Sequence, residues 1–242
     1  MVAAGYDPSA HIDVLPDHRI IYLCVPKSAS SRIKTSLGAL LGRRLSSSED
    51  ANNRKLSGLK APHHVGLSAF YRLAMDANTL RFSFVRNPYG RLVSCWADKF
   101  QDKPLVSGDP FVEQYLAARA QIDPSLPAGA DRTLSFADFV RFVSEPVAQR
   151  LNAHWQLQQE LVEGPAIPLN FVGRLESFDS DFSRVFDHAG AGEALRSATH
   201  LPVNSSTRRP WRDYYTAELA DRIYRAYERD FDRFRYPRSL SG

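Results

Sequence analysis

The sequence predicts an α/β fold of three layers, in which helices cover both faces of a central parallel sheet. Short runs rich in β-branched and aromatic residues occur at 20–25, 80–85 and 167–172, and apolar residues recur at helical spacing after each run. Strands that alternate with helices favour a parallel sheet with ligand loops at the carboxyl ends of its strands. The 242 residues, of which 43% are hydrophobic, suit a single domain over 1–242.

The first strand, loop and helix of this pattern span residues 20–41. Ile20 to Val25 predicts a buried strand that Pro26 ends, and a helix is expected to begin near Ser30 or Ser31. Lys27 and three serines lie where the chain turns between them. Free backbone N–H groups and the positive end of the helix dipole point into such a loop. The stretch therefore predicts a P-loop-like anion site.

This loop is not a Walker A motif. Its lysine comes first, whereas that motif ends in Gly-Lys-Ser/Thr, and no glycine lies between Val25 and Leu37. A plain βα turn with a helix cap and a solvated lysine would contain the same residue types. Both interpretations stay open on this stretch alone, and a second motif has to decide between them.

The rest of the chain supplies the other expected elements. Residues 1–18 form an N-terminal extension, and the polar stretch 42–62 and the proline-rich stretch 104–132 are expected to be variable insertions. Ser135, with Asp138 three positions later, predicts a capped helix that ends near Phe142. Further helices are expected at 67–75, 91–100, 147–162, 178–188 and, from apolar residues four apart, 219–231.

Composition narrows the class of protein. No apolar run approaches the roughly 20 residues that a membrane span needs, and the N-terminus lacks a signal-peptide pattern, so we expect a soluble, cytoplasmic protein. Cys24 and Cys95 lie in apolar runs without metal-ligand spacing, which predicts buried thiols and no metal site. The net charge of +4 suits an anionic ligand. Basic residues interleave with acidic ones, which argues against a nucleic-acid groove.

The second strand-turn-helix unit carries the deciding motif. Arg86 follows a strand, and Ser94 lies eight positions later on the next helix. Together with V-P-K-S-A-S-S after the first strand, this arrangement resembles the sulfotransferases that use 3′-phosphoadenosine 5′-phosphosulfate (PAPS). The segment from Val85 to Phe100 is similar to the Golgi carbohydrate sulfotransferase branch. Segments 154–155, 171–176 and 227–236 are also similar to that branch.

The resemblance implies how the chain would hold PAPS, whose spent form is adenosine 3′,5′-bisphosphate (PAP). Lys27 would stabilise charge on the bridging oxygen as the sulfuryl group passes in line to an acceptor, so no metal is required. The 5′-phosphosulfate would lie on the loop formed by Pro26, Lys27, Ser28, Ala29, Ser30 and Ser31. The 3′-phosphate would be held by Arg86 and Ser94 and by a late basic loop with Ser206, Arg208 and Arg209.

The acceptor implied by the resemblance is a hydroxyl of a carbohydrate or glycoconjugate. A hydroxyl needs a base to take its proton, and His64, 22 positions before Arg86, is the candidate, with His63 as the neighbour that stays open. His64 could equally be a loop or helix-cap residue.

Two other functions stay open. A nucleotide-kinase-like phosphoryl transferase shares the strand-loop-helix plan and would depend on ATP and Mg²⁺, but the missing Gly-Lys-Ser/Thr argues against it. A non-catalytic protein that binds adenosine bisphosphate would need no base, and His64 argues modestly against that function. Residue types alone give no oligomeric state.

Overall fold

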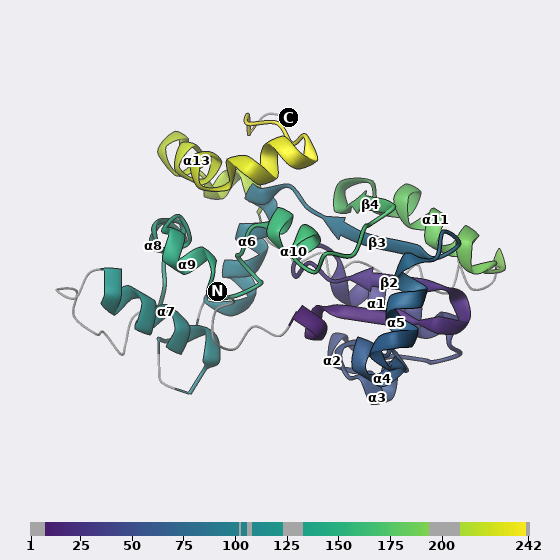
Figure 1. Ribbon diagram of the computed structural model, residues 1–242. Coiled ribbons are helices and arrows are strands. Elements are labelled where there is room, and N and C mark those ends of the chain that lie inside the picture. Colours follow the sequence, from purple (N-terminus) through teal and green to yellow (C-terminus); the bar gives the residue numbers. More distant parts are fainter. Residues whose placement is uncertain (1–7, 102, 106–107, 123–132, 194–208, 241–242) are drawn as a thin grey trace. The chain divides into compact units, whose positions relative to one another are not determined.

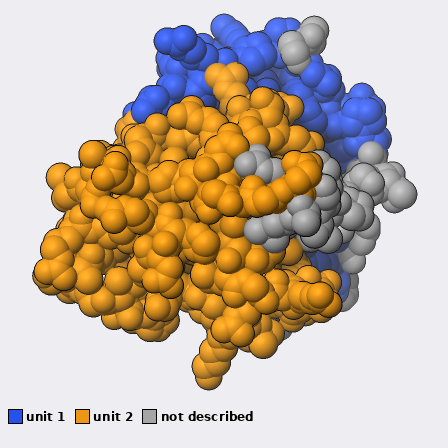
Figure 2. Space-filling model, turned by 90° about the vertical axis from the view of Figure 1, so that its right-hand side faces the viewer, with its two compact units in different colours: residues 1–6, 87–159, 208–242 blue, residues 7–86, 160–207 orange. Residues whose placement is uncertain are grey.

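The computed structural model describes residues 8–101, 103–105, 108–122, 133–193 and 209–240 (Figure 1). The chain forms two compact units, coloured separately in Figure 2. Unit 1 contains residues 1–6, 87–159 and 208–242, and unit 2 contains residues 7–86 and 160–207. No helix among the described residues has the length and apolar composition that crossing a membrane requires.

Unit 2 contains a sheet of four strands in the order β1-β2-β3-β4. The strands are β1 (Ile12–Leu15), β2 (Ile20–Leu23), β3 (Leu80–Val85) and β4 (Phe171–Arg174). β2, β3 and β4 are parallel, as predicted, and β1 pairs antiparallel with β2. β1 lies inside the segment 1–18, which we expected to be only an extension. Four residues with an aspartate among them carry too little periodicity to predict a strand.

Side chains that alternate along the strands build two cores, one on each face of the sheet. Tyr22, Phe82 and Phe84 belong to a core shared with helices α1 (Ser30–Leu40) and α11 (Phe178–Ala189). Ile21 and Leu23 belong to the other core, which helix α5 (Leu67–Met75) covers. Both faces of the sheet are therefore buried, which is the three-layer arrangement that the sequence predicts.

The segment 42–62 of unit 2 is more ordered than a variable connection. It contains α2 (Ser48–Asn52) and α3 (Arg54–Ser57), and α4 (Pro62–Val65) begins at its end. Ala51 and Leu59 are buried, and Lys60 pairs with Val14 beside β1. Short helices of four or five residues contain too few turns to show a period in the sequence.

Unit 1 is largely helical. Ser135 accepts a hydrogen bond from the Asp138 N–H at the start of α8, so the predicted cap is confirmed. The predicted C-terminal helix is also confirmed, although it kinks at Tyr227. The helices of this unit are α6 (Pro88–Lys99), α7 (Pro110–Ile122), α8 (Phe136–Val143), α9 (Pro146–Gln149), η4 (Trp211–Tyr214) and α13 (Ala217–Phe234).

The single helix predicted over 147–162 is wrong. α9 ends at Gln149 and α10 (Gln158–Glu163) begins nine residues later. Between these two helices, distant side chains bind backbone groups that would otherwise pair within a helix. Arg91 donates to the carbonyls of Ala153 and Gln156, at 2.6 and 2.7 Å. Asp230 accepts from the N–H groups of Gln158 and Gln159. These partners come from α6 and α13, so the local sequence could not predict them.

The third strand begins later than predicted, at Phe171 instead of Ile167. Pro168 has no N–H for a ladder, and its carbonyl accepts from the Arg81 side chain at 2.7 Å. The Asn170 side chain accepts from the Arg81 N–H and donates to the Thr79 carbonyl. Residues 168–170 are therefore tied to β3 by these side-chain bonds and by one backbone bond, from the Asn170 N–H to the Arg81 carbonyl at 2.9 Å, and β4 begins at the next residue.

Candidate functional site

The loop between β2 and α1 has a strained backbone. Lys27 and Ala29 have φ angles of 68° and 64°, in the left-handed region. A residue with a Cβ costs roughly 1–2 kcal/mol in that region. Strain of this kind gathers at ligand sites, where the surrounding structure holds it. A left-handed residue directly before a helix also turns successive N–H groups toward one point, as in backbone nests that bind anions.

The N-terminus of α1 opens onto this loop without a side-chain cap. Its N-cap residue is Ala29, whose side chain makes no capping hydrogen bond. The first helical bond runs from the Ile33 N–H to the Ala29 carbonyl, at 3.0 Å. The N–H groups of a first helical turn have no partner within the helix, and the dipole is positive there. An anion bound here would accept hydrogen bonds from these N–H groups.

Arg86 lies beside the same loop. It follows β3 directly, and its Nη1 donates to the Lys27 carbonyl at 3.4 Å. β2 and β3 are parallel neighbours, so their carboxyl ends place the loop and Arg86 at one edge of the sheet. Lys27 and Arg86 are both half-buried. The structure thus brings the Arg86 guanidinium to the backbone of Lys27, a residue 59 positions away in the sequence.

The other residues predicted for the 3′-phosphate do not belong to the described part of unit 2. Ser94 is a half-buried residue on α6 of unit 1. The Arg209 guanidinium, also in unit 1, lies 4.0 Å above the Tyr214 ring. Ser206 and Arg208 lie outside the described residues. Their contribution to a phosphate site stays a prediction.

His64 has the geometry of a helix cap. Its Nδ1 accepts a hydrogen bond from the Ala61 N–H at 3.2 Å, at the start of α4. A neutral imidazole with an accepting Nδ1 carries its proton on Nε2. The ring of His63 lies 4.2 Å from that of His64, and both side chains are exposed.

The two histidines lie at the edge of the sheet that carries the loop. Val14 and Lys60 form an antiparallel bridge, with N–O distances of 2.8 and 3.3 Å. The chain from Lys60 to α4 therefore runs opposite to β1 and parallel to β2. It reaches the edge where β2 ends, about two strand spacings, or roughly 10 Å, across the sheet from β2.

A buried ionic cluster joins β1, α1 and α3, and sequence reasoning missed it. Asp13 is fully buried and accepts from the Arg54 Nε and Nη2 at 3.2 and 3.0 Å. The Lys34 ammonium lies 3.5 Å from Asp13 and donates to Asn52 at 3.0 Å. One acid within the apolar run Ile12–Leu15 was the only sequence signal for this cluster.

Cys24, the residue after β2, lies close to this cluster. Burial raises the pKa of the Cys24 thiol, and the nearby Lys34 ammonium partly offsets that rise. The thiol also lies beside the hydroxyl of Ser30, the first residue of α1. Cys24 and Cys95 are both buried thiols, as predicted. In the part of the chain that the structure describes, no cluster of His, Cys, Asp or Glu could hold a metal ion.

Comparison with known proteins adds the family. A profile of the sulfotransferase family matches residues 10–237. Carbohydrate sulfotransferase 11 of Mus musculus is 29% identical over 242 residues, which cover 93% of this chain and 67% of that protein. Carbohydrate sulfotransferase 14 of Homo sapiens is 29% identical over 94% of this chain and 60% of its own length. Carbohydrate sulfotransferase 10 of Mus musculus is 25% identical over 93% and 66%.

No solved structure matches the chain. The family match covers nearly the whole chain and includes both strand-loop-helix units with Lys27 and Arg86. These three relatives are named as carbohydrate sulfotransferases. The chain belongs to the sulfotransferase family.

Proposed function

We propose that this protein transfers a sulfuryl group from PAPS to a hydroxyl of a carbohydrate acceptor. The meeting of Lys27 and Arg86 at an uncapped helix N-terminus carries the proposal. A phosphosulfate is anionic over several oxygens, which matches two cations and a first turn of N–H groups. The names of the relatives support a carbohydrate as the acceptor.

Lys27 would act on the transferring group. PAPS supplies an activated sulfuryl group, and negative charge develops on the bridging oxygen as that group leaves. A lysine ammonium at the loop stabilises this charge, and the left-handed backbone of Lys27 and Ala29 fixes the direction of the N–H groups beforehand. Arg86 would hold a phosphate with its planar fork of donors.

A cavity of about 650 Å³ beside His64 suits an acceptor. It is lined by residues of α3, of the following turn and of α4: Asn53, Arg54, Lys55, Gly58, Leu59, Lys60 and His64. His64 would take the proton of the acceptor hydroxyl. Because Nδ1 carries the basic lone pair in the tautomer that this hydrogen bond implies, the role requires His64 to release the Ala61 N–H.

The binding of PAP tests the donor site. We expect calorimetry to show that PAP binds more tightly than ATP with Mg²⁺, and that Arg86→Ala weakens PAP binding by about 10- to 100-fold, since a charged hydrogen bond contributes roughly 1.5–3 kcal/mol. Arg86→Lys keeps the charge but not the fork and should lose less. Arg72→Ala, at an exposed site on α5, is the matched control. Tighter binding of ATP, or an unaffected Arg86 variant, would point to kinase-like chemistry instead.

A pair of histidine variants tests the base. His64→Gln should lower kcat by about 10²-fold, because a positioned base contributes at least this much, while PAP affinity stays the same. His63→Gln is the control on the same helix turn. Steady-state kinetics with a saturating carbohydrate acceptor gives the answer. Loss of kcat in the His63 variant alone would assign the base to His63, and loss in neither would remove both.

A further inference from the structure

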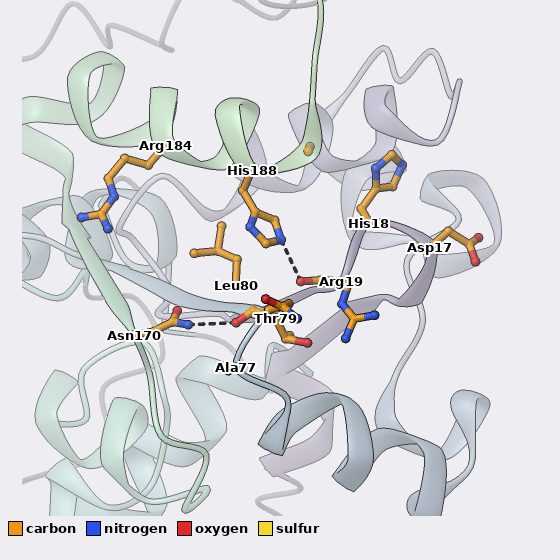
Figure 3. A pocket seen from close by; sticks show the side chains of 11 residues that line it. Asp17, His18, Arg19, Ala77, Thr79, Leu80, Asn170, Arg184 and His188 are labelled. Carbon is orange, nitrogen blue, oxygen red and sulfur yellow. Dashed lines mark hydrogen bonds between the residues drawn. The ribbon is translucent and has the colours of Figure 1, made fainter.

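A second cavity, of about 720 Å³, lies at the opposite edge of the sheet from the Lys27 loop. Its walls are the residues that precede β2, β3 and β4 and the last turns of α11 (Figure 3). Thr79, at its floor, is seven residues before Arg86 along β3, which corresponds to about 23 Å of extended strand. The cavity is therefore separate from the proposed donor site.

Basic residues outnumber acidic ones in the lining of this cavity. Four basic residues line it, His18, Arg19, Arg184 and His188, and Asp17 is the one carboxylate among the lining residues. Arg19 is committed to an ion pair with Asp76. Arg184 and His188 are one helical turn apart on the exposed face of α11, and both line the cavity, although their side chains extend in different directions (Figure 3).

Arg184 is held in place without a carboxylate. Its guanidinium lies 4.4 Å from the centre of the Phe171 ring. No ion pair joins it to an acid among the residues that the structure describes. A guanidinium that lies over an aromatic ring keeps its N–H donors at its edge, where they can bind a second group. Stacking thus orients Arg184 while its charge stays uncompensated.

His188 and Thr79 add further polar groups. The His188 Nε2 lies 3.1 Å from the Arg19 carbonyl, and since a carbonyl only accepts, Nε2 carries the proton. Nδ1 is then the nitrogen available to a ligand, and it becomes a second donor in the imidazolium form. Thr79 is 1% exposed, and its Oγ1 has no hydrogen-bond partner among the described residues. A buried hydroxyl without a partner is unusual and points to a ligand or water in the cavity.

We propose that this cavity is a second anion site, which binds a sulfate or phosphate monoester through Arg184 and His188. Arg184 is the lining cation that no carboxylate pairs with among the described residues, which favours an anion as the ligand. A guanidinium fork matches the oxygens of a tetrahedral monoester, and His188 adds a donor at Nδ1 in its imidazolium form. The inference stands on unit 2 alone and does not depend on the proposed donor site.

Titration with sugar esters tests the site. Glucose 6-sulfate, glucose 6-phosphate and glucose are titrated by calorimetry into the full chain with saturating PAP, which occupies the Lys27 loop. Both esters should bind and glucose should not, and the stronger ester identifies the ligand's acid group. Arg184→Gln should weaken ester binding about tenfold, and Arg184→Gln with His188→Gln should abolish it. Arg72→Gln, exposed on α5, should leave it unchanged.

The outcomes separate this site from the donor site. Absence of ester binding to the unmodified chain, equal binding of glucose, or the same loss in Arg72→Gln would overturn the proposal. Loss of ester binding in Lys27→Ala but not in Arg184→Gln would place the esters at the loop and also overturn it. The chain could also bind the esters through Arg184 and fail to bind PAP. That result would support the second site and overturn the proposed donor site.

Discussion

Replacing Lys27 with alanine should lower kcat by about 10³-fold and leave the free energy of unfolding almost unchanged. Lys27 is half-buried at the loop, with a left-handed backbone, and its carbonyl accepts a hydrogen bond from Arg86. Alanine keeps the Cβ, so the backbone strain at φ 68° is the same in both proteins. The substitution therefore removes the ammonium and leaves the loop.

Two measurements make this prediction specific. The turnover of PAPS with a saturating carbohydrate acceptor gives kcat, and calorimetry with PAP gives the affinity of the loop for the spent donor. A lysine that acts mainly on charge developing during transfer should affect kcat more than PAP affinity. Lys27→Arg keeps a cation with a different shape and should retain part of the activity. Undiminished turnover in Lys27→Ala would remove the lysine from the mechanism.

The sequence could predict which edge of the sheet carries the candidate site, because each of the two strands that end there has its own apolar run. The apolar runs before Pro26 and Arg86 end two strands, and parallel strands end at one edge. The conformation of the loop was not predictable. Left-handed φ angles are expected at glycine, and here they occur at Lys27 and Ala29. Only the folded structure around the loop imposes them.

The buried cluster of Asp13, Lys34 and Arg54 was unpredictable for another reason. Its members come from β1, α1 and α3, and the segment that contains Arg54 seemed a solvated insertion by composition. Nothing in the sequence shows that Arg54 folds back onto β1. The same limit explains the broken helix at 147–162, where Arg91 and Asp230 from distant helices bind the backbone. Long-range polar contacts overrule local periodicity in both cases.

Replacing Arg54 with methionine should destabilise unit 2 by about 3–5 kcal/mol, because it leaves a buried carboxylate without its main partner. Arg54 donates through Nε and Nη2 to Asp13, which is fully buried. The same Nη2 donates to the carbonyls of Ala10 and Ile12, at 3.1 and 3.0 Å. Methionine keeps much of the apolar stem, so the loss reports on the guanidinium.

Urea denaturation followed by two probes measures this loss in the right unit. All three tryptophans, Trp96, Trp155 and Trp211, lie in unit 1, so their fluorescence reports that unit, whereas far-UV circular dichroism reports both. We expect the Arg54 variant to lower the midpoint of the circular dichroism transition, while Arg72→Met changes neither probe. Asp13→Asn with Arg54→Met should cost less than the two single losses added together, because the residues interact. A loss below about 1 kcal/mol in Arg54→Met would mean that the pair behaves as a solvated surface ion pair and does not hold the segment 42–62 against β1.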